Sequence, residues 1–104
     1  MTILGKKMIW IIVCNDKEDA LPRRMSIIEK HREYLSTNPI KTLISGPLTL
    51  EDGKTMKGSF FMVEANDISE IYKFQENDPL FHADVWESIK ISPFNKRVDN
   101  LSKN

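Results

Sequence analysis

Residues 8–14 read MIWIIVC, an apolar run that ends at the loop-forming pair Asn15-Asp16. The run is rich in isoleucine, valine and tryptophan, which indicates a strand rather than a helix. Successive side chains of a strand point to opposite faces of its sheet. Both faces of this strand are apolar, with Ile9, Ile11 and Val13 on one and Met8, Trp10 and Ile12 on the other. We therefore predict a buried strand.

Five further elements are expected along the chain. They are, in order, a helix over 22–35, strands over 40–48 and 58–65, a helix from Asp67 to about Asn77, and a strand over 85–91. Asp52-Gly53 is a strong hairpin signal, and Asp67 with Glu70 forms a capping box. The order βαββαβ predicts the ferredoxin-like split βαβ arrangement, an α+β fold with a four-stranded antiparallel sheet and two helices on one face.

Length and composition restrict the class of protein. With 104 residues, the chain is expected to form a single domain with its core over 8–94, an extension over 1–7 and a polar tail over 95–104. Fifteen basic and fifteen acidic residues cancel, so no overall field attracts nucleic acid or a membrane surface, and we expect neither partner. The single cysteine, Cys14, excludes an intramolecular disulfide and fits a cytoplasmic protein.

His31 is the main candidate for chemistry. It lies three residues after Ile28 and four before Leu35 on an expected apolar stripe of the first helix, which also includes Leu21 and Met25. Residues at this spacing share one face of a helix, so we predict that His31 points to the interior. An imidazole there suits proton transfer, because it titrates near neutral pH.

A buried imidazole needs a polar partner, and Asp78 is the candidate. Asp78 precedes Pro79 at the end of the second helix, and the proline restricts its backbone. We predict that His31 and Asp78 lie within hydrogen-bond reach, directly or through one water, in a concave pocket beside the Ser59 strand. The alternatives are a core histidine bonded to a backbone carbonyl or to Tyr34, and an aspartate that only ends a helix.

Two further residues could bind polar groups of a substrate. Arg24 lies seven residues before His31 and shares its helix face; an ion pair with an acidic neighbour is favoured over an anchor for an anionic substrate. Ser59 follows Gly58, which indicates a position where another backbone comes close.

His82 and Asp84 could join Asp78 in a metal site, because three such ligands fall within a short stretch. A solvated loop role is favoured for His82, and we expect no bound metal. Cys14, at the end of an apolar strand, is interpreted as a small buried hydrophobic residue.

A set of short motifs occurs in fixed order. They are Arg24, His31 and Tyr34-Leu35, then Gly46-Pro47-Leu48, Asp52-Gly53, Gly58-Ser59, Asp78-Pro79, and the ending from Glu87-Ser88 to Pro93-Phe94. In this order and spacing the chain resembles the YciI-like family from Met8 to about Phe94. Two departures are the pair Ala83-Asp84, where the family usually has Ala-Gly, and the short extension over 1–7. Asp84 is expected to add a charge near the pocket mouth.

The resemblance implies a dimeric α+β barrel, the fold shared with muconolactone isomerase-like proteins. It also implies a site built on a histidine and an aspartate, which by position are His31 and Asp78, with Ser59 near the same pocket. A relative removes chloride from a chlorinated hydroxyhydroquinone without a cofactor, so we expect no cofactor here.

These features support three hypotheses about function. The first is a cofactor-independent lyase, isomerase or dehalogenase acting on small organic molecules, in which His31 moves the proton, Asp78 orients it, and Ser59 and Arg24 bind substrate. The second is a non-catalytic small-molecule binding or sensor protein with the same pocket. The third is an accessory dimerisation module.

The apolar face that the helices leave open is large for a monomer. We expect a homodimer packed through this face, with contributions from Trp10, from Phe60 or Phe61, and from Met62.

Overall fold

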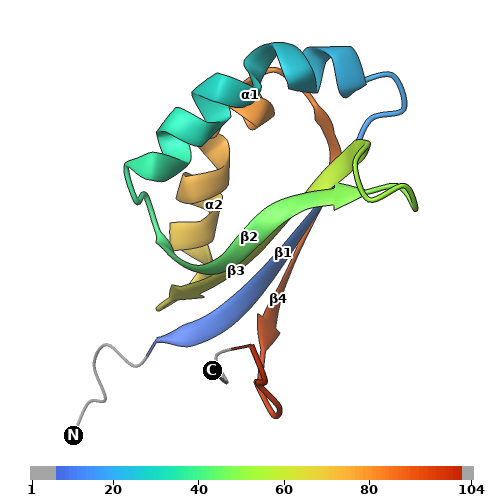
Figure 1. Cartoon of the computed structure of the whole chain (residues 1–104). Helices are drawn as coiled ribbons and strands as arrows, with labels where there is room; N and C mark the ends of the chain where they lie inside the picture. The colour runs from blue at the N-terminus through green and yellow to red at the C-terminus, as the bar shows by residue number, and fades with distance from the viewer. Residues whose placement is uncertain (1–6, 102–104) are drawn as a thin grey trace, which may run out of the picture.

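The computed structural model describes residues 7–101, so residues 1–6 of the expected extension and 102–104 of the expected tail lie outside the described residues. The elements are β1 (Met8–Asp16), α1 (Leu21–Ser36), β2 (Lys41–Thr49), β3 (Met56–Ala65), α2 (Ile68–Glu76), α3 (Pro79–His82) and β4 (Trp86–Phe94). The strands form one antiparallel sheet in the order β2-β3-β1-β4. The three helices lie on one face of it (Figure 1). The predicted ferredoxin-like α+β fold is confirmed.

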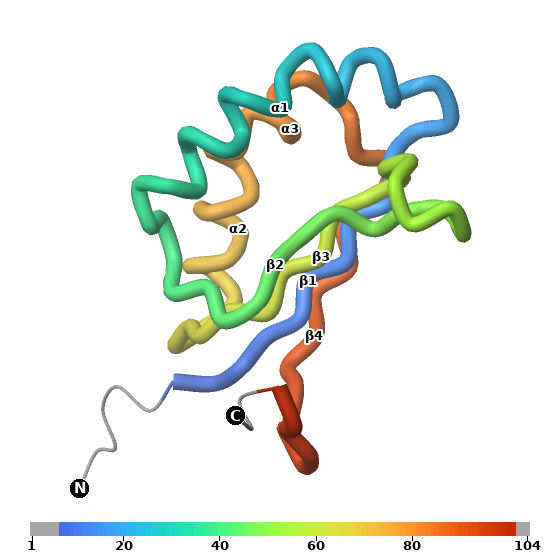
Figure 2. Tube along the Cα trace, in the orientation of Figure 1, coloured from blue at the N-terminus to red at the C-terminus, as the bar shows by residue number. Residues whose placement is uncertain are grey.

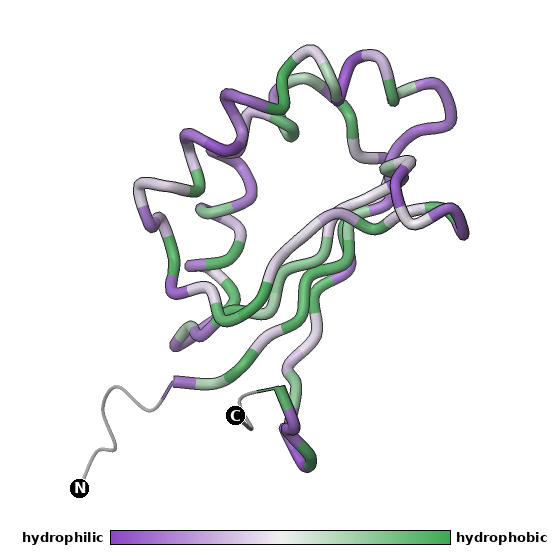
Figure 3. Tube along the Cα trace, viewed as in Figure 1, coloured by the Kyte–Doolittle hydropathy of each residue, from purple (hydrophilic) through white to green (hydrophobic). Residues whose placement is uncertain are grey.

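β1 is an interior strand of the sheet, hydrogen-bonded to β3 on one side and to β4 on the other. The side chains of β1 that face the helices are buried, namely Trp10, Ile12 and Cys14. Those on the open face are half-buried, namely Ile9, Ile11 and Val13. Most of β1 has the colour of hydrophobic residues in Figure 3. The expectation that Trp10 contributes to the open face is wrong, because Trp10 is buried on the helix side, where its indole N–H donates to the Ala65 carbonyl (3.1 Å). Of the two phenylalanines considered for the open face, Phe61 is buried on the helix side and Phe60 is half-buried on the other.

The apolar stripe predicted for α1 is wrong in part. Leu21 and Met25 are 37% and 50% exposed, whereas the buried residues of this helix are Arg24, Ile28 and His31. These three are spaced by four and then three residues, which places them on one helix face. Hydrophobic periodicity does not identify this face, because its first residue is an arginine. Arg24 is buried because Asp16 of β1 forms an ion pair with it.

The short helix α3 is absent from the sequence prediction, which places only a turn at Asp78. Asn77 ends α2 as expected, and the Asp67–Glu70 capping box at the start of α2 is confirmed. Asp78 then caps the N-terminus of α3 by accepting a hydrogen bond from the Leu80 N–H (2.8 Å). α3 lies beneath α1 (Figure 2), so this cap brings the Asp78 carboxylate under the first helix. No helix within residues 7–101 has the length and apolar character needed to cross a membrane.

Gly58 lies where the backbone of β1 comes very close to β3. A Cβ atom on Gly58 would lie 2.3 Å from the carbonyl oxygen of Cys14, so the backbone would have to move. We expect Gly58→Ala to lower the free energy of unfolding by about 1–3 kcal/mol, the usual effect of overpacking. Urea unfolding measures the loss. Gly46→Ala is the matched control, because nothing lies within 4 Å of its Cβ position; equal midpoints for the two variants would contradict the expectation.

Candidate functional site

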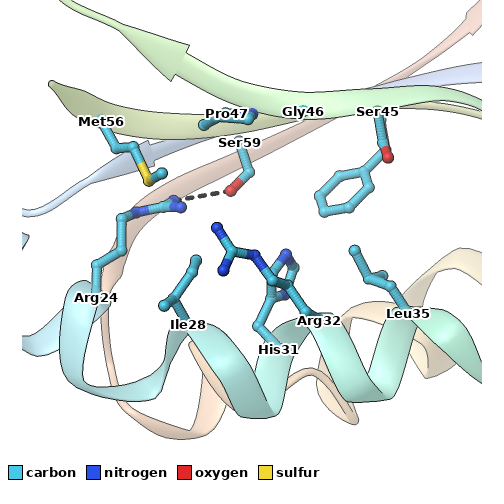
Figure 4. Close-up of a pocket in the computed structure, with 11 residues that line it drawn as sticks. Arg24, Ile28, His31, Arg32, Leu35, Ser45, Gly46, Pro47, Met56 and Ser59 are labelled. Carbon is cyan, nitrogen blue, oxygen red and sulfur yellow. Dashed lines mark hydrogen bonds between the residues drawn. The ribbon is translucent and has the colours of Figure 1, made fainter. Parts of the chain in front are cut away.

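A cavity of about 180 Å³ lies between α1 and the strands β2 and β3 (Figure 4). It is lined by Arg24, Ile28, His31, Arg32 and Leu35 of α1, by Ser45, Gly46 and Pro47 of β2, and by Met56, Ser59 and Phe61 of β3. Apolar walls with a few polar groups are typical of small-molecule sites. An apolar protein cavity of about 150 Å³ is known to hold benzene, so this cavity is large enough for one six-membered ring.

His31 and Asp78 form a buried pair beside the cavity. Nδ1 of His31 lies 2.9 Å from Oδ1 and 3.0 Å from Oδ2 of Asp78, within the reach expected from the sequence. The imidazole lines the cavity, whereas Asp78 is 0% exposed and is not part of the wall. The expected arrangement is therefore corrected in one respect: only His31 lines the cavity, and Asp78 holds the ring from outside the cavity wall.

The hydrogen bonds of Asp78 fix the position of the proton on His31. An ionised carboxylate only accepts hydrogen bonds, so Nδ1 is the donor in this pair; the assignment follows from the hydrogen-bond network. In the neutral imidazole Nε2 then carries the lone pair, and it has no hydrogen-bond partner within the described part of the chain. A fixed tautomer with a free acceptor nitrogen at a cavity wall is the arrangement that a general base needs.

The alternative partner for His31, Tyr34, is engaged elsewhere. Its hydroxyl donates to the Phe74 carbonyl (2.7 Å). Burial, and to a lesser degree the Asp78 carboxylate, raises the pKa of Tyr34 above its ordinary value, so the hydroxyl keeps the proton for that bond. The His31 ring packs edge-on against Phe61, with centroids 6.4 Å apart, and this contact further limits its rotation.

Arg24 lines the cavity and is buried, with 1% of the residue exposed. Its Nε and Nη2 donate to Oδ2 and Oδ1 of Asp16 at 2.7 and 2.9 Å, which is the ion pair that the sequence favoured. Nη2 also donates to the Ser59 hydroxyl oxygen (2.8 Å; Figure 4). Since Ser59 accepts from the guanidinium, its own hydrogen is free to donate to a ligand in the cavity. The site thus offers an acceptor at His31 and a donor at Ser59.

The other predicted ligands are not brought to this site. His82 is exposed at the end of α3, and neither it nor Asp84 lines the cavity. Residues 7–101 contain no group of three histidine, cysteine, aspartate or glutamate side chains placed to share a metal ion, so the alternative metal site of these two residues with Asp78 is not formed.

Two residues at or beside this cavity are absent from the sequence prediction. Asp16, the partner of Arg24, lies at the end of β1 and carries no sequence signal of that pairing. Arg32 lines the cavity, and its spacing is a signal for this position: it lies four residues after Ile28, so it borders the buried face of the helix.

Residues 8–95 match the sequence model of the YCII-related domain. The chain belongs to the YCII-related domain family. Protein YciI from Escherichia coli O6:H1 and Protein YciI from Shigella flexneri are each 27% identical to it over 96 residues, which cover 86% of this chain and 98% of the relative.

Two solved structures extend the comparison of this YCII-related domain. The 5-chloro-2-hydroxyhydroquinone dehydrochlorinase TftG from Burkholderia phenoliruptrix, solved with 2,5-dihydroxybenzoquinone, superposes with a TM-score of 0.77 at 29% identity, covering 85% of this chain and 94% of TftG. A NIPSNAP family protein from Agrobacterium tumefaciens has a TM-score of 0.53 at 14% identity over 95% of this chain and 96% of its own, which reflects the shared fold alone. The family likeness to TftG supports a role in binding or converting a small molecule.

Asp84 stands where the YciI-like pattern usually has glycine, and its backbone explains the preference. Its φ of 59° is in the left-handed region, which glycine adopts readily and aspartate tolerates better than most residues. The carboxylate pairs with Lys17 Nζ (2.6 Å), and this exposed pair lowers the pKa of Asp84. Asp84 is not among the residues that line the cavity, so its carboxylate is not part of the cavity wall.

Cys14 of this YCII-related domain is expected to be unreactive in the folded chain. It is fully buried, and its thiol lies 3.4 Å from Oε1 of Gln75. Burial, followed by the negative charge of Asp78, raises the pKa of the Cys14 thiol well above its usual value, so the reactive thiolate is not populated near neutral pH. A chromogenic disulfide reagent should therefore label the native protein only at the rate of unfolding and the denatured protein at once. Rapid labelling without denaturant would contradict this expectation.

Proposed function

We propose that this YCII-related domain is a cofactor-independent enzyme that transfers a proton on a small ring compound, in a reaction of the lyase, isomerase or dehalogenase type. The observation that carries the proposal is the hydrogen bond between His31 and Asp78, 2.9 Å long, with the imidazole on the wall of a cavity of about 180 Å³. A carboxylate that orients an imidazole and stabilises its charged form is a recurring device for general base catalysis.

In the proposed reaction, Nε2 of His31 removes a proton from a hydroxyl or an activated carbon of the substrate. The resulting imidazolium is stabilised by the Asp78 carboxylate, and the negative charge that develops on a substrate oxygen is stabilised by the Ser59 hydroxyl, itself oriented by Arg24. On a chlorinated hydroxy-substituted ring, the net change is the loss of one proton and one chloride ion. This change balances without an oxidant or a reductant.

The likeness to TftG favours this class of substrate. TftG is 29% identical to the chain and is named for dehydrochlorination of a single-ring hydroxyhydroquinone. The cavity of this chain has room for one such ring. The presence of a lined cavity at His31 also speaks against a role as a dimerisation module alone.

The test is chloride release from 5-chloro-2-hydroxyhydroquinone, followed with a chloride electrode and corrected for the spontaneous reaction. A panel of small hydroxy-substituted rings and cyclic ketones tests for isomerase and lyase reactions. For each compound, NMR monitors the exchange of C–H protons with deuterium. Enzyme-dependent turnover of any of these compounds is expected. Saturable binding with no turnover across the panel would favour the alternative function, a small-molecule binding or sensor protein.

We propose further that two copies pack through the open sheet face and that the dimer is cytoplasmic. The described helices leave this face uncovered (Figure 1), and Ile11 pairs there with Met62, which in turn pairs with Ile44. Burying this row of apolar side chains in a dimer interface is favourable by roughly 25 cal/mol per Å² of apolar surface. Sedimentation at micromolar concentration should give twice the monomer mass, and Met62→Glu should lower it to the monomer mass. A monomeric unaltered chain would contradict the proposal.

A further inference from the structure

Arg32 lines the cavity, and its side chain is 59% exposed, so it lies at the solvent-exposed mouth of the cavity. It follows Ile28 by four residues and precedes Leu35 by three, and all of these side chains line the cavity. In Figure 4 its guanidinium points from the helix toward the strands, between Ile28 and His31 in the view. Arg32 therefore faces whatever ligand lies against the imidazole.

The charges around the cavity are unbalanced in favour of an anion. Two arginines and no aspartate or glutamate belong to its lining residues. The charge of Arg24 is already compensated by the buried Asp16 carboxylate, which binds it through two hydrogen bonds. Arg32 is different, because its partner Glu29 lies three residues earlier on the outer surface of the helix and does not line the cavity.

The Arg32–Glu29 pair is a weak competitor for a ligand. The side chains of Arg32 and Glu29 are 59% and 75% exposed, and exposed pairs of this kind contribute little, because water and salt screen them. A guanidinium can bind a carboxylate or another planar oxyanion through two parallel hydrogen bonds, whereas Glu29 is bound by Arg32 through Nη1 alone. An anionic group at the cavity mouth can thus replace Glu29 as the partner of Arg32.

We infer that Arg32 is a specificity-determining residue that selects single-ring ligands bearing an anionic oxygen substituent. The ring lies against His31 and Ser59, and the anionic substituent lies at the cavity mouth on the Arg32 guanidinium. This inference rests on the proposed function, since it names the substrate class for the same site. It concerns recognition, however, and can be tested by binding alone.

The experiment compares two probes that differ in charge but hardly in shape, 2,5-dihydroxybenzoate and 2,5-dihydroxybenzamide. Dissociation constants are measured by calorimetry or NMR titration. The unaltered chain should bind the acid about three- to fivefold more tightly than the amide, because Arg32 is 59% exposed and its charge is partly screened. Arg32→Gln should weaken binding of the acid by about the same factor and leave binding of the amide unchanged. Added salt should reduce the preference for the acid.

Two control variants separate a local contact from the general field of the helix. Lys30→Gln removes one positive charge from α1 at an exposed residue that does not line the cavity, and it should leave both affinities nearly unchanged. Glu29→Gln removes the competing carboxylate and should maintain or increase affinity for the acid.

The inference is overturned if the unaltered chain binds both probes equally or binds neither. It is also overturned if Arg32→Gln changes both affinities alike, or if Lys30→Gln has the same effect as Arg32→Gln. These results differ from a failure of the proposed function. Selective binding of the acid without turnover of any substrate would support the role of Arg32 and refute the enzymatic role, whereas turnover without charge preference would do the reverse.

Discussion

Turnover by the His31→Asn protein is expected to fall by about 10²–10⁴-fold, the usual contribution of a positioned general base. His31 provides the free ring nitrogen at the cavity wall, and no other histidine lines the cavity. The rate is measured as chloride release, or as proton exchange, on whichever substrate of the panel is turned over. His82→Asn is the matched control, because His82 is exposed and lies outside the cavity; it should retain full activity.

Asp78→Asn tests the orienting role within the same pair. An asparagine can still accept the Leu80 N–H and so preserve the cap of α3. Its amide can donate to Nδ1, however, which would leave the proton on the wrong ring nitrogen, and a loss in the same range as for His31→Asn is expected. Thermal unfolding by circular dichroism checks that each variant is folded. Full activity in a folded His31→Asn protein would rule out the proposed base.

Asp16→Asn is expected to lower the free energy of unfolding by about 3–5 kcal/mol, the range found when one partner of a buried ion pair is removed. Asp16 holds both Nε and Nη2 of Arg24, and the side chains are 6% and 1% exposed. Without the carboxylate, the guanidinium is left with only the neutral Ser59 hydroxyl and the asparagine oxygen. Urea unfolding followed by circular dichroism gives the change.

Asp84→Asn is the control for Asp16→Asn, because the Asp84 carboxylate pairs with Lys17 on the exposed surface. Asparagine also tolerates the left-handed backbone at this position, so little change in stability is expected. A double variant, Asp16→Leu with Arg24→Met, should recover part of the stability lost in Asp16→Asn, since no charge remains buried without a partner. An unchanged midpoint in Asp16→Asn would show that the pair contributes nothing to folding.

Local sequence features predicted the order and the type of the main elements. The MIWIIVC run is long enough and rich enough in β-branched residues for a strand, and Asp52-Gly53 closes a real hairpin between β2 and β3. The left-handed φ of Gly53, 71°, is what such a turn needs. The Asp67–Glu70 box begins α2 as expected. Each of these signals acts over a few neighbouring residues, so it can be read without the rest of the chain.

The stripe of α1 shows where such reading fails. Periodicity assigns apolar residues such as Leu21 and Met25 to the buried face. Arg24 is buried instead, because its guanidinium forms an ion pair with Asp16 of β1. α3 was missed for a related reason. Its four residues are too few for a periodic pattern, and its start depends on the cap that the Asp78 side chain supplies.

By itself the sequence determined the βαββαβ order, the family likeness, and the candidacy of His31 and Asp78, because these depend on local pattern and on motif spacing. Tertiary structure alone decided that Asp78 meets Nδ1 of His31 at 2.9 Å, that Asp16 compensates Arg24, and that Arg32 stands at the cavity mouth. The His31–Asp78 pair joins residues 47 positions apart. Such contacts arise only when α1 packs over α3 and the sheet, since the burial of a polar side chain depends on which partner the packing brings to it.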